Sequence, residues 1–207
     1  MKKQSTFLYV LRLALTLLLI TSCMAAALAG VNALTKDRIT AITKEKTDKA
    51  IREVLPDTGF VFTDSMENHQ DALKTDIVKT LYTAYNEAPS CTLDGGHIIG
   101  YAVEVVPSGF DGEITMIVGF DTQYKITGIS IISHTETAGL GAVAAANNAS
   151  GEAFRNQFVG KSGELAVTKD GGEVDAITGA TITSRAVVEG VNAATECMTL
   201  ISNALKG

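Results

Sequence analysis

One uncharged apolar run near the start of the chain constrains the fold more than any other feature. It extends from Leu13 to Leu34, and Lys2, Lys3 and Arg12 precede it. About 20 apolar residues suffice to cross the hydrocarbon of a bilayer as a helix. Because positively charged flanks stay in the cytoplasm, we expect residues 1–34 to form a cytoplasmic N-terminus and a single-pass anchor in the cytoplasmic (inner) membrane. The bulk of the chain would then be extracytoplasmic.

Two alternatives for this run involve processing. A cleaved signal peptide has an apolar core of roughly 7 to 15 residues. The segment Ile20–Cys23 is similar to a lipoprotein cleavage box, in which case Cys23 would be lipidated. The run continues well beyond Cys23, which a removed signal would not need. We therefore favour an uncleaved anchor embedded in the lipid bilayer.

Composition and cysteine usage exclude several classes of protein. The net charge of -6, with few and scattered basic residues, offers no surface for phosphate backbones, so nucleic acid is not an expected partner. No CxxC pair or Cys/His cluster is present, so no metal site is predicted. No Gly-x-Ser-x-Gly elbow or P-loop is present either, and no catalytic residue is predicted. Cys91 and Cys197 are expected to be small buried hydrophobes, and the sequence does not show whether they pair.

The chain after the anchor changes from helical to strand patterning. Apolar residues at spacings near three and four predict a helix from Thr35 to Leu55, which Pro56 ends. Residues 35–77 would form this juxtamembrane helix and a connection. Four short strands separated by turns are then predicted, at Val78–Tyr85, His97–Val106, Glu113–Asp121 and Lys125–Ser133. Their connections are too short for crossover helices, which indicates an antiparallel sheet.

Helical patterning returns after the sheet. We expect a helix over Ala142–Phe158, a short strand near Glu164–Thr168, and a long helix over Thr183–Leu205. The last helix carries one apolar stripe, made of Ala186, Val187, Gly190, Val191, Ala194, Met198 and Ile201. Residues 78–207 are thus predicted to form an α+β domain, with helices packed on an antiparallel sheet.

The segment from Asp175 to Arg185 carries the chemistry. Gly179 and Ala180 are small enough to let a ligand approach the backbone, and Thr183 or Ser184 could cap the helix that follows. Unpaired amides in the first turn of a helix form a site for an anion such as phosphate. The alternative is an ordinary capped turn without a ligand, which most Gly-plus-Thr helix starts are.

The same segment resembles a known family. The run Asp175–Thr181 (DAITGAT) resembles the flavinylation motif of an FMN-binding domain. The G subunit of the Rnf electron transport complex and the C subunit of the sodium-pumping NADH:quinone oxidoreductase share this domain. The resemblance implies that Thr181 bears FMN through a phosphoester, attached by a flavin transferase that uses FAD. It also implies that Asp175 is recognised by the transferase, and that Thr178, Gly179 and Ala180 shape the attachment loop.

Two upstream segments extend the resemblance. Ser133–Gly141 is similar to the family's His-x-Glu-Thr-Pro-Gly-Leu-Gly segment close to the flavin, with Ala138 at the usual Pro position. This implies that Glu136, Thr137, Leu140 and Gly141 belong to the cofactor site, although Glu136 could equally be an exposed loop carboxylate. Pro107–Ile114 resembles the family's Gly-aromatic-x-Gly turn, with Glu113 in place of a common Pro.

The resemblance implies an electron-transfer subunit of a membrane-bound, ion-translocating ferredoxin:NAD oxidoreductase. The apolar run contains no Asp, Glu, His or Lys, so the path for Na⁺ or H⁺ is expected in partner subunits of the complex. Three alternatives are the C subunit of the NADH:quinone pump, a freestanding anchored flavoprotein, and an anchored binding module without redox chemistry. The short chain favours the Rnf assignment.

Overall fold

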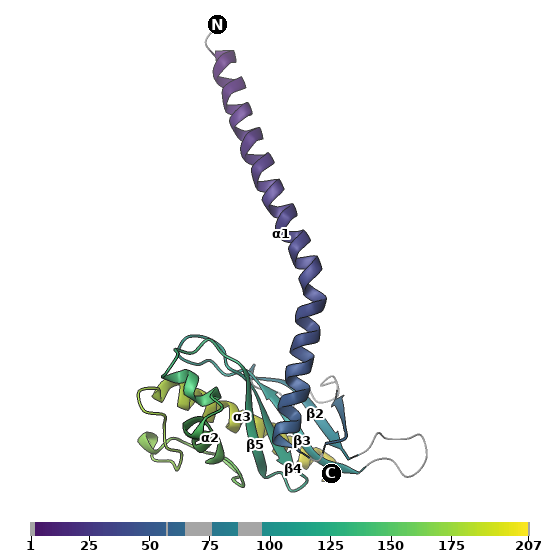
Figure 1. The fold of residues 1–207 in the computed structure, drawn as a ribbon, viewed down its shortest axis with the longest axis vertical. Coiled ribbons are helices and arrows are strands. Elements are labelled where there is room, and N and C mark those ends of the chain that lie inside the picture. The colour runs from purple at the N-terminus through teal and green to yellow at the C-terminus, as the bar shows by residue number, and fades with distance from the viewer. Residues whose placement is uncertain (1–2, 57, 65–75, 87–96, 207) are drawn as a thin grey trace, which may run out of the picture. The chain divides into compact units, whose positions relative to one another are not determined.

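The computed structural model describes residues 3–56, 58–64, 76–86 and 97–206, and it divides into two compact units. The first unit is Met1–Glu45 and the second is Lys46–Gly207. Helix α1 (Lys3–Val54) contributes to both, since its last turns from Lys46 onward belong to the second unit. The predicted anchor and the predicted juxtamembrane helix are therefore parts of one helix, which ends just before Pro56 as expected (Figure 1).

The first unit consists of the apolar part of α1. Every side chain from Phe7 to Glu45 is exposed, and the helix is long and apolar enough to cross a membrane. Its threonine hydroxyls bond to the helix backbone, since Thr16 Oγ1 donates to Leu13 O at 2.8 Å and Thr21 Oγ1 donates to Leu17 O at 3.0 Å. Such internal bonds satisfy the hydroxyl groups without water, as a helix in lipid requires.

The second unit is built on one antiparallel sheet with strand order β1-β2-β3-β4-β5. The strands are β1 (Phe60–Asp64), β2 (Val78–Tyr85), β3 (Ile98–Val105), β4 (Thr115–Asp121) and β5 (Ile126–Ser133). The prediction of an α+β fold with an antiparallel sheet is confirmed, and the four predicted strands match β2 to β5 within two residues at either end. Strand β1 was not predicted, although it pairs with β2 from Phe60↔Tyr85 to Asp64↔Leu81.

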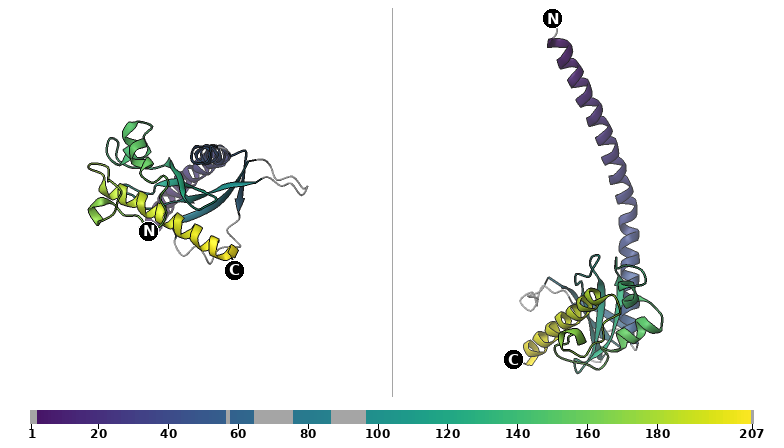
Figure 2. Two further views of the ribbon diagram at one scale, coloured as in Figure 1. Left: turned by 90° about the horizontal axis from the view of Figure 1, so that it is seen from below. Right: turned by 90° about the vertical axis from the view of Figure 1, so that its left-hand side faces the viewer.

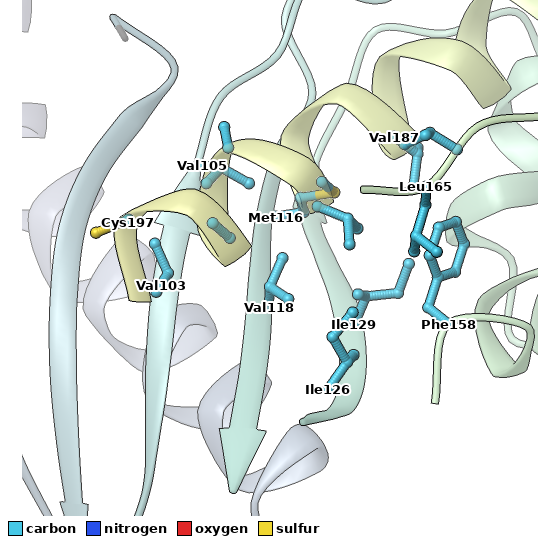
Figure 3. Close-up of a cluster of buried hydrophobic side chains, with 14 of the residues drawn as sticks. Val103, Val105, Met116, Val118, Ile126, Ile129, Phe158, Leu165, Val187 and Cys197 are labelled. Carbon is cyan, nitrogen blue, oxygen red and sulfur yellow. The ribbon is translucent and has the colours of Figure 1, made fainter. Parts of the chain in front are cut away.

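Two layers of helix cover the two faces of this sheet (Figure 2). Alternate residues of β4 separate the faces, since Met116 and Val118 lie in the larger apolar cluster and Ile117 lies in the smaller one. The smaller cluster contains Ala50, Ile51 and Val54 from the end of α1, and Leu55, which follows the helix. The larger cluster lies against the C-terminal helix α3 (Thr181–Lys206), and Figure 3 shows its side chains between the strands and this helix.

Helix α3 packs on the sheet through the stripe that the sequence predicts. Val187, Val191 and Met198 are at most 1% exposed, and burying each side chain stabilises the fold by about 1.5–3 kcal/mol. Gly190 lies at the closest approach, because a Cβ there would fall 2.9 Å from Pro107 Cγ and would collide with Met116. The helix therefore passes close to the turn after β3, which brings its N-terminus near the loop after β5.

Two predicted elements are wrong. The helix expected over Ala142–Phe158 is divided into a 3-10 turn, η3 (Gly141–Ala145), and helix α2 (Ala149–Asn156), because Asn148 starts a new helix by accepting a 3.0 Å bond from the Gly151 amide. The strand expected over Glu164–Thr168 is absent from the described residues. Leu165 and Val167 are buried there as part of the core. A single parallel bridge joins Val167 to Val174, and the 3-10 turn η4 (Thr168–Asp170) follows.

Cys197 is a buried hydrophobe on α3, as predicted, and burial raises the pKa of its thiol to about 11. Cys91 lies outside the described residues, so its burial stays a prediction. Cys23 is exposed on α1.

Candidate flavin site

The buried carboxylate of Glu136 joins three segments that are far apart in the sequence. Its Oε1 accepts from the amides of Phe110 at 2.7 Å and Asp111 at 3.2 Å, and its Oε2 accepts from Thr183 Oγ1 at 2.5 Å. Glu136 is 7% exposed, so the alternative of an exposed loop carboxylate is wrong. Three donors to one buried carboxylate form charge-assisted bonds, the strong class of hydrogen bond. Glu136 therefore positions the surrounding loops.

Glycines around Glu136 make this arrangement possible. A Cβ at Gly109 would collide with Glu136 Oε1 and would fall 2.9 Å from Ile114 Cδ1. A Cβ at Gly141 would fall 2.6 Å from Thr183 Oγ1 and would collide with Glu136 Oε2. Each glycine contacts a different oxygen of the carboxylate, so the loop before β4 and the loop after β5 can both reach it.

The loop that leads into α3 is held by its own hydrogen bonds. The Ile177 amide donates to Ser184 Oγ at 3.0 Å, and Ser184 Oγ donates to Ala180 O at 3.0 Å. Gly179 has φ of +77°, a left-handed conformation that side chains disfavour. The helix begins at Thr181, two residues earlier than predicted, so Thr183 and Ser184 lie in its first turn and the prediction that either caps the helix is wrong.

A pocket of about 320 Å³ opens over the start of α3, and we call it the acceptor pocket. Thr181 lies half-buried at the first position of the helix and contributes to the lining. Phe110, Leu140 and Ile182 supply exposed apolar side chains, at 65%, 45% and 51% exposure. The remaining lining residues are Glu136, Thr137, Gly141, Lys169, Gly179, Ala180 and Thr183. Apolar groups and a few convergent polar groups are typical of a cofactor site.

The polar end of the acceptor pocket suits an anion. Lys169 is the only cation among the described lining residues, and its Nζ donates to Thr181 Oγ1 at 3.0 Å. The first amides of α3 have no carbonyl four residues earlier within the helix. The positive end of the helix dipole adds to the attraction for a negative group. The carboxylate of Glu136, the one anionic side chain among these lining residues, is occupied by its three donors.

An ion pair fixes the turn that carries Lys169. The next residue, Asp170, accepts two bonds from Arg185, from Nε at 2.7 Å and from Nη2 at 2.6 Å. This hydrogen-bonded guanidinium holds the pKa of the Asp170 carboxyl below its usual value. Arg185 stands four residues after Thr181 on α3, so the pair ties the lysine-bearing turn to the helix that carries the threonine.

Comparison with known proteins assigns the family. Residues 109–196 match the family model described as "FMN-binding domain". The chain is 36% identical over 205 residues to the G subunit of the Na⁺-translocating ferredoxin:NAD⁺ oxidoreductase complex of Acetobacterium woodii, covering 92% of each chain. It is 31% identical over 183 residues to the G subunit of an ion-translocating oxidoreductase complex of Methanosarcina acetivorans, covering 87% of this chain and 90% of the relative.

The chain belongs to the Rnf complex G-subunit family. A further relative, from Clostridium ljungdahlii, is named as the G subunit of a proton-translocating ferredoxin:NAD⁺ oxidoreductase complex. It is 42% identical over 109 residues, covering 51% of this chain and 56% of that one. Relatives named for Na⁺ and for protons are thus both similar to this chain, and similarity does not distinguish the coupling ion.

The site residues expected from helix capping and from the family resemblance fall into three groups. Eight of them line the acceptor pocket: Glu136, Thr137, Leu140, Gly141, Gly179, Ala180, Thr181 and Thr183. Ser184 is fully buried behind the loop and bonds only to loop backbone in the described structure. Asp175 and Thr178 line a different pocket of about 600 Å³, which we call the Asp175 pocket. The predicted site residues therefore line two different pockets, and Ser184 lines neither.

Sequence reasoning missed three residues of the acceptor pocket: Phe110, Lys169 and Ile182. Phe110 is the aromatic residue of the Gly-aromatic-x-Gly turn, so that resemblance contained the signal for it. Ile182 directly follows the motif threonine. Lys169 stands twelve residues before Thr181 in the bonded pair and belongs to no motif, so only the folded turn η4 reveals it.

Proposed function

We propose that this chain is the electron-transfer subunit of an Rnf-type membrane complex and carries FMN covalently on Thr181. The observation that supports this most is the position of the Thr181 hydroxyl. It lies at the first residue of α3, in a pocket that has an apolar rim and a cation. FMN has a flat, largely apolar ring and an anionic phosphate, and the pocket offers a matching surface for each part.

Attachment would be a phosphoryl transfer catalysed by a flavin transferase. The Thr181 oxygen forms a bond to the phosphorus on the FMN side of FAD, and the pyrophosphate P–O bond breaks. AMP leaves, and the hydroxyl proton is released. In this step Thr181 supplies the acceptor hydroxyl, and it then acts as an anchor that takes no part in later turnover. Asp175 would serve recognition by the transferase.

A covalent link suits a flavin outside the cytoplasm. A dissociated flavin would be lost there, whereas a tether keeps its effective concentration at the pocket about millimolar or higher. The bound FMN would supply electron transfer, while Thr137, Leu140, Gly141 and their neighbours set its position and its access to water. Among the described residues, no cluster of His, Cys, Asp and Glu could hold a metal ion.

The proposed topology follows from α1. Its exposed apolar stretch would cross the cytoplasmic membrane once, with Lys2, Lys3 and Arg12 inside and the second unit extracytoplasmic. The partners would be the other subunits of the complex, which couple electron flow between ferredoxin and NAD to transport of Na⁺ or H⁺. The span from Leu13 to Leu34 contains no Asp, Glu, His, Lys or Arg, which leaves the ion path to those subunits.

In-gel flavin fluorescence after denaturing electrophoresis tests the proposal. The full chain and Thr181→Ala are each co-expressed with an active flavin transferase, and we expect fluorescence in the first and none in the second. Thr199→Ala is the matched control, because Thr199 is an exposed threonine on the same helix that does not line the acceptor pocket. Equal fluorescence in Thr181→Ala, or none in any variant while a known flavoprotein is labelled, would disprove the assignment.

A further inference from the structure

Lys169 has a place at the site that the flavinylation motif does not explain. It is the only cation among the described residues that line the acceptor pocket, and its Nζ lies 3.0 Å from the acceptor oxygen of Thr181. A lysine side chain has many rotamers, so holding it toward one hydroxyl costs conformational entropy that other contacts must offset. The turn that carries Lys169 restricts this side chain.

Turn η4 is held on both sides of Lys169. On one side, the Thr168 amide donates to Val174 O at 2.8 Å, and Val167 is buried in the core. On the other side, the Asp170 carboxylate receives both bonds from Arg185 of α3. The base of the lysine side chain is thus tied to the same helix that begins with Thr181.

Attachment of a phosphate changes what the lysine can bind. In the free protein the Thr181 oxygen accepts the Lys169 bond. Once that oxygen is esterified, it bridges to phosphorus and is a weaker acceptor. The two non-bridging oxygens of the phosphodiester then carry the negative charge, and they are bonded to the phosphorus that Thr181 Oγ1 holds. A charged donor prefers such oxygens to a neutral ester oxygen.

We propose that Lys169 binds the phosphate of the threonine-linked flavin, with Nζ donating to a non-bridging oxygen and the Asp170–Arg185 pair positioning the turn. This rests on the proposed attachment of FMN to Thr181. The lysine neutralises the one negative charge of the phosphodiester beside the start of α3. It therefore favours formation of the ester and fixes the tether from which the flavin ring extends.

The test uses the full chain in detergent micelles after co-expression with a flavin transferase. The variants are Lys169→Ala and Lys169→Arg, and Lys161→Ala is the matched control because Lys161 pairs with Glu173 and does not line the acceptor pocket. The first readout is the ³¹P resonance of the bound phosphodiester at low and high salt. The second is the fraction of chain labelled in a limited time, read from in-gel fluorescence.

In the wild type and Lys161→Ala, raising the salt from about 0.1 M to 1 M shortens the Debye length from about 10 Å to 3 Å and should shift the resonance. In Lys169→Ala the resonance should start displaced and move much less. Labelling of Lys169→Ala should be about three- to tenfold slower, with partial recovery in Lys169→Arg. A resonance and salt response in Lys169→Ala equal to wild type would overturn the assignment. If wild type gives no phosphodiester signal, the attachment to Thr181 fails and this role fails with it.

Discussion

The two pockets that the loop 175–181 lines differ in the chemistry of their walls. The acceptor pocket combines Lys169, the amides at the start of α3 and an apolar rim. The Asp175 pocket contains a carboxylate and no cation among its described lining residues. A phosphate is favoured in the first and repelled in the second. The single motif thus contains residues of two kinds: Gly179, Ala180 and Thr181 line the acceptor pocket, where we propose that FMN binds, and Asp175 and Thr178 line the other pocket.

The largest expected effect belongs to Gly141→Ala, which should disrupt the acceptor pocket and leave the Asp175 pocket intact. The added methyl would fall 2.6 Å from Thr183 Oγ1 and would displace the Glu136 carboxylate. We expect the free energy of unfolding to fall by about 3 kcal/mol and flavin labelling to be largely lost. Urea denaturation and in-gel fluorescence measure the two effects.

Gly139→Ala is the control for the same loop. Nothing lies within 4 Å of its added Cβ, and only its φ of +75° opposes the change, at about 1 kcal/mol. If Gly141→Ala lowers the free energy of unfolding no more than Gly139→Ala does, the Glu136 carboxylate does not pack against Gly141 as the structure shows.

Glu136→Gln keeps the shape and removes the charge. The remaining oxygen can accept from the Phe110 and Asp111 amides, and the new NH₂ can donate to Thr183 Oγ1. The buried Thr183 hydroxyl then loses its acceptor, and we expect a loss of about 2 kcal/mol in urea denaturation. Glu113→Gln, at an exposed carboxylate of the neighbouring turn, should be neutral. A neutral Glu136→Gln would mean that the charge at Glu136 is not needed to join the three segments.

Asp175→Asn tests the role of the Asp175 pocket independently of the acceptor pocket. The Asp175 side chain is exposed, and the bonds that hold this residue come from its backbone, with the amide donating to Gln157 Oε1 at 2.7 Å. Stability should therefore be unchanged, while labelling by the transferase should fall about tenfold if an interfacial carboxylate contact is lost. Glu152→Gln on α2 is the control, and equal labelling of both variants would remove Asp175 from transferase recognition.

Patterns that depend on neighbouring residues predicted the fold well. The segments that form β2 to β5 have strand composition and are bounded by turns, and the stripe on α3 is buried as its spacing indicates. Strand β1 was not predicted, because a segment of five residues is too short to show a clear sequence pattern. Its pairing with β2 defines it as a strand. Leu165 and Val167 alternate as in a strand, yet they are buried by core packing without a partner strand among the described residues. The spacing of apolar residues predicts which side chains are buried, but it does not predict which element covers them.

The site divides in the same way. Motif resemblance predicted Thr181 and the loop 136–141 as site residues, because each motif is continuous in sequence, and both line the acceptor pocket. It could not show that Glu136 holds the Phe110 amide and the Thr183 hydroxyl together, since those contacts span 26 and 47 residues. Nor could it find Lys169, which reaches Thr181 only because the η4 turn folds back on α3.

The smallest expected effect belongs to Asp170→Asn, which tests how the acceptor pocket holds its cation. Asp170 and Arg185 are exposed, so water and salt weaken their attraction, and flavin labelling should fall less than about twofold. The pKa of the Asp170 carboxyl is lowered in the folded chain, so its contribution is present above the unfolded pKa and is lost as the pH falls below about 4. The difference in thermal stability between wild type and Asp170→Asn should therefore shrink on acidification. If Asp170→Asn instead impairs labelling as strongly as Lys169→Ala, the position of the lysine matters as much as its charge, and the acceptor pocket depends on the ion pair outside it.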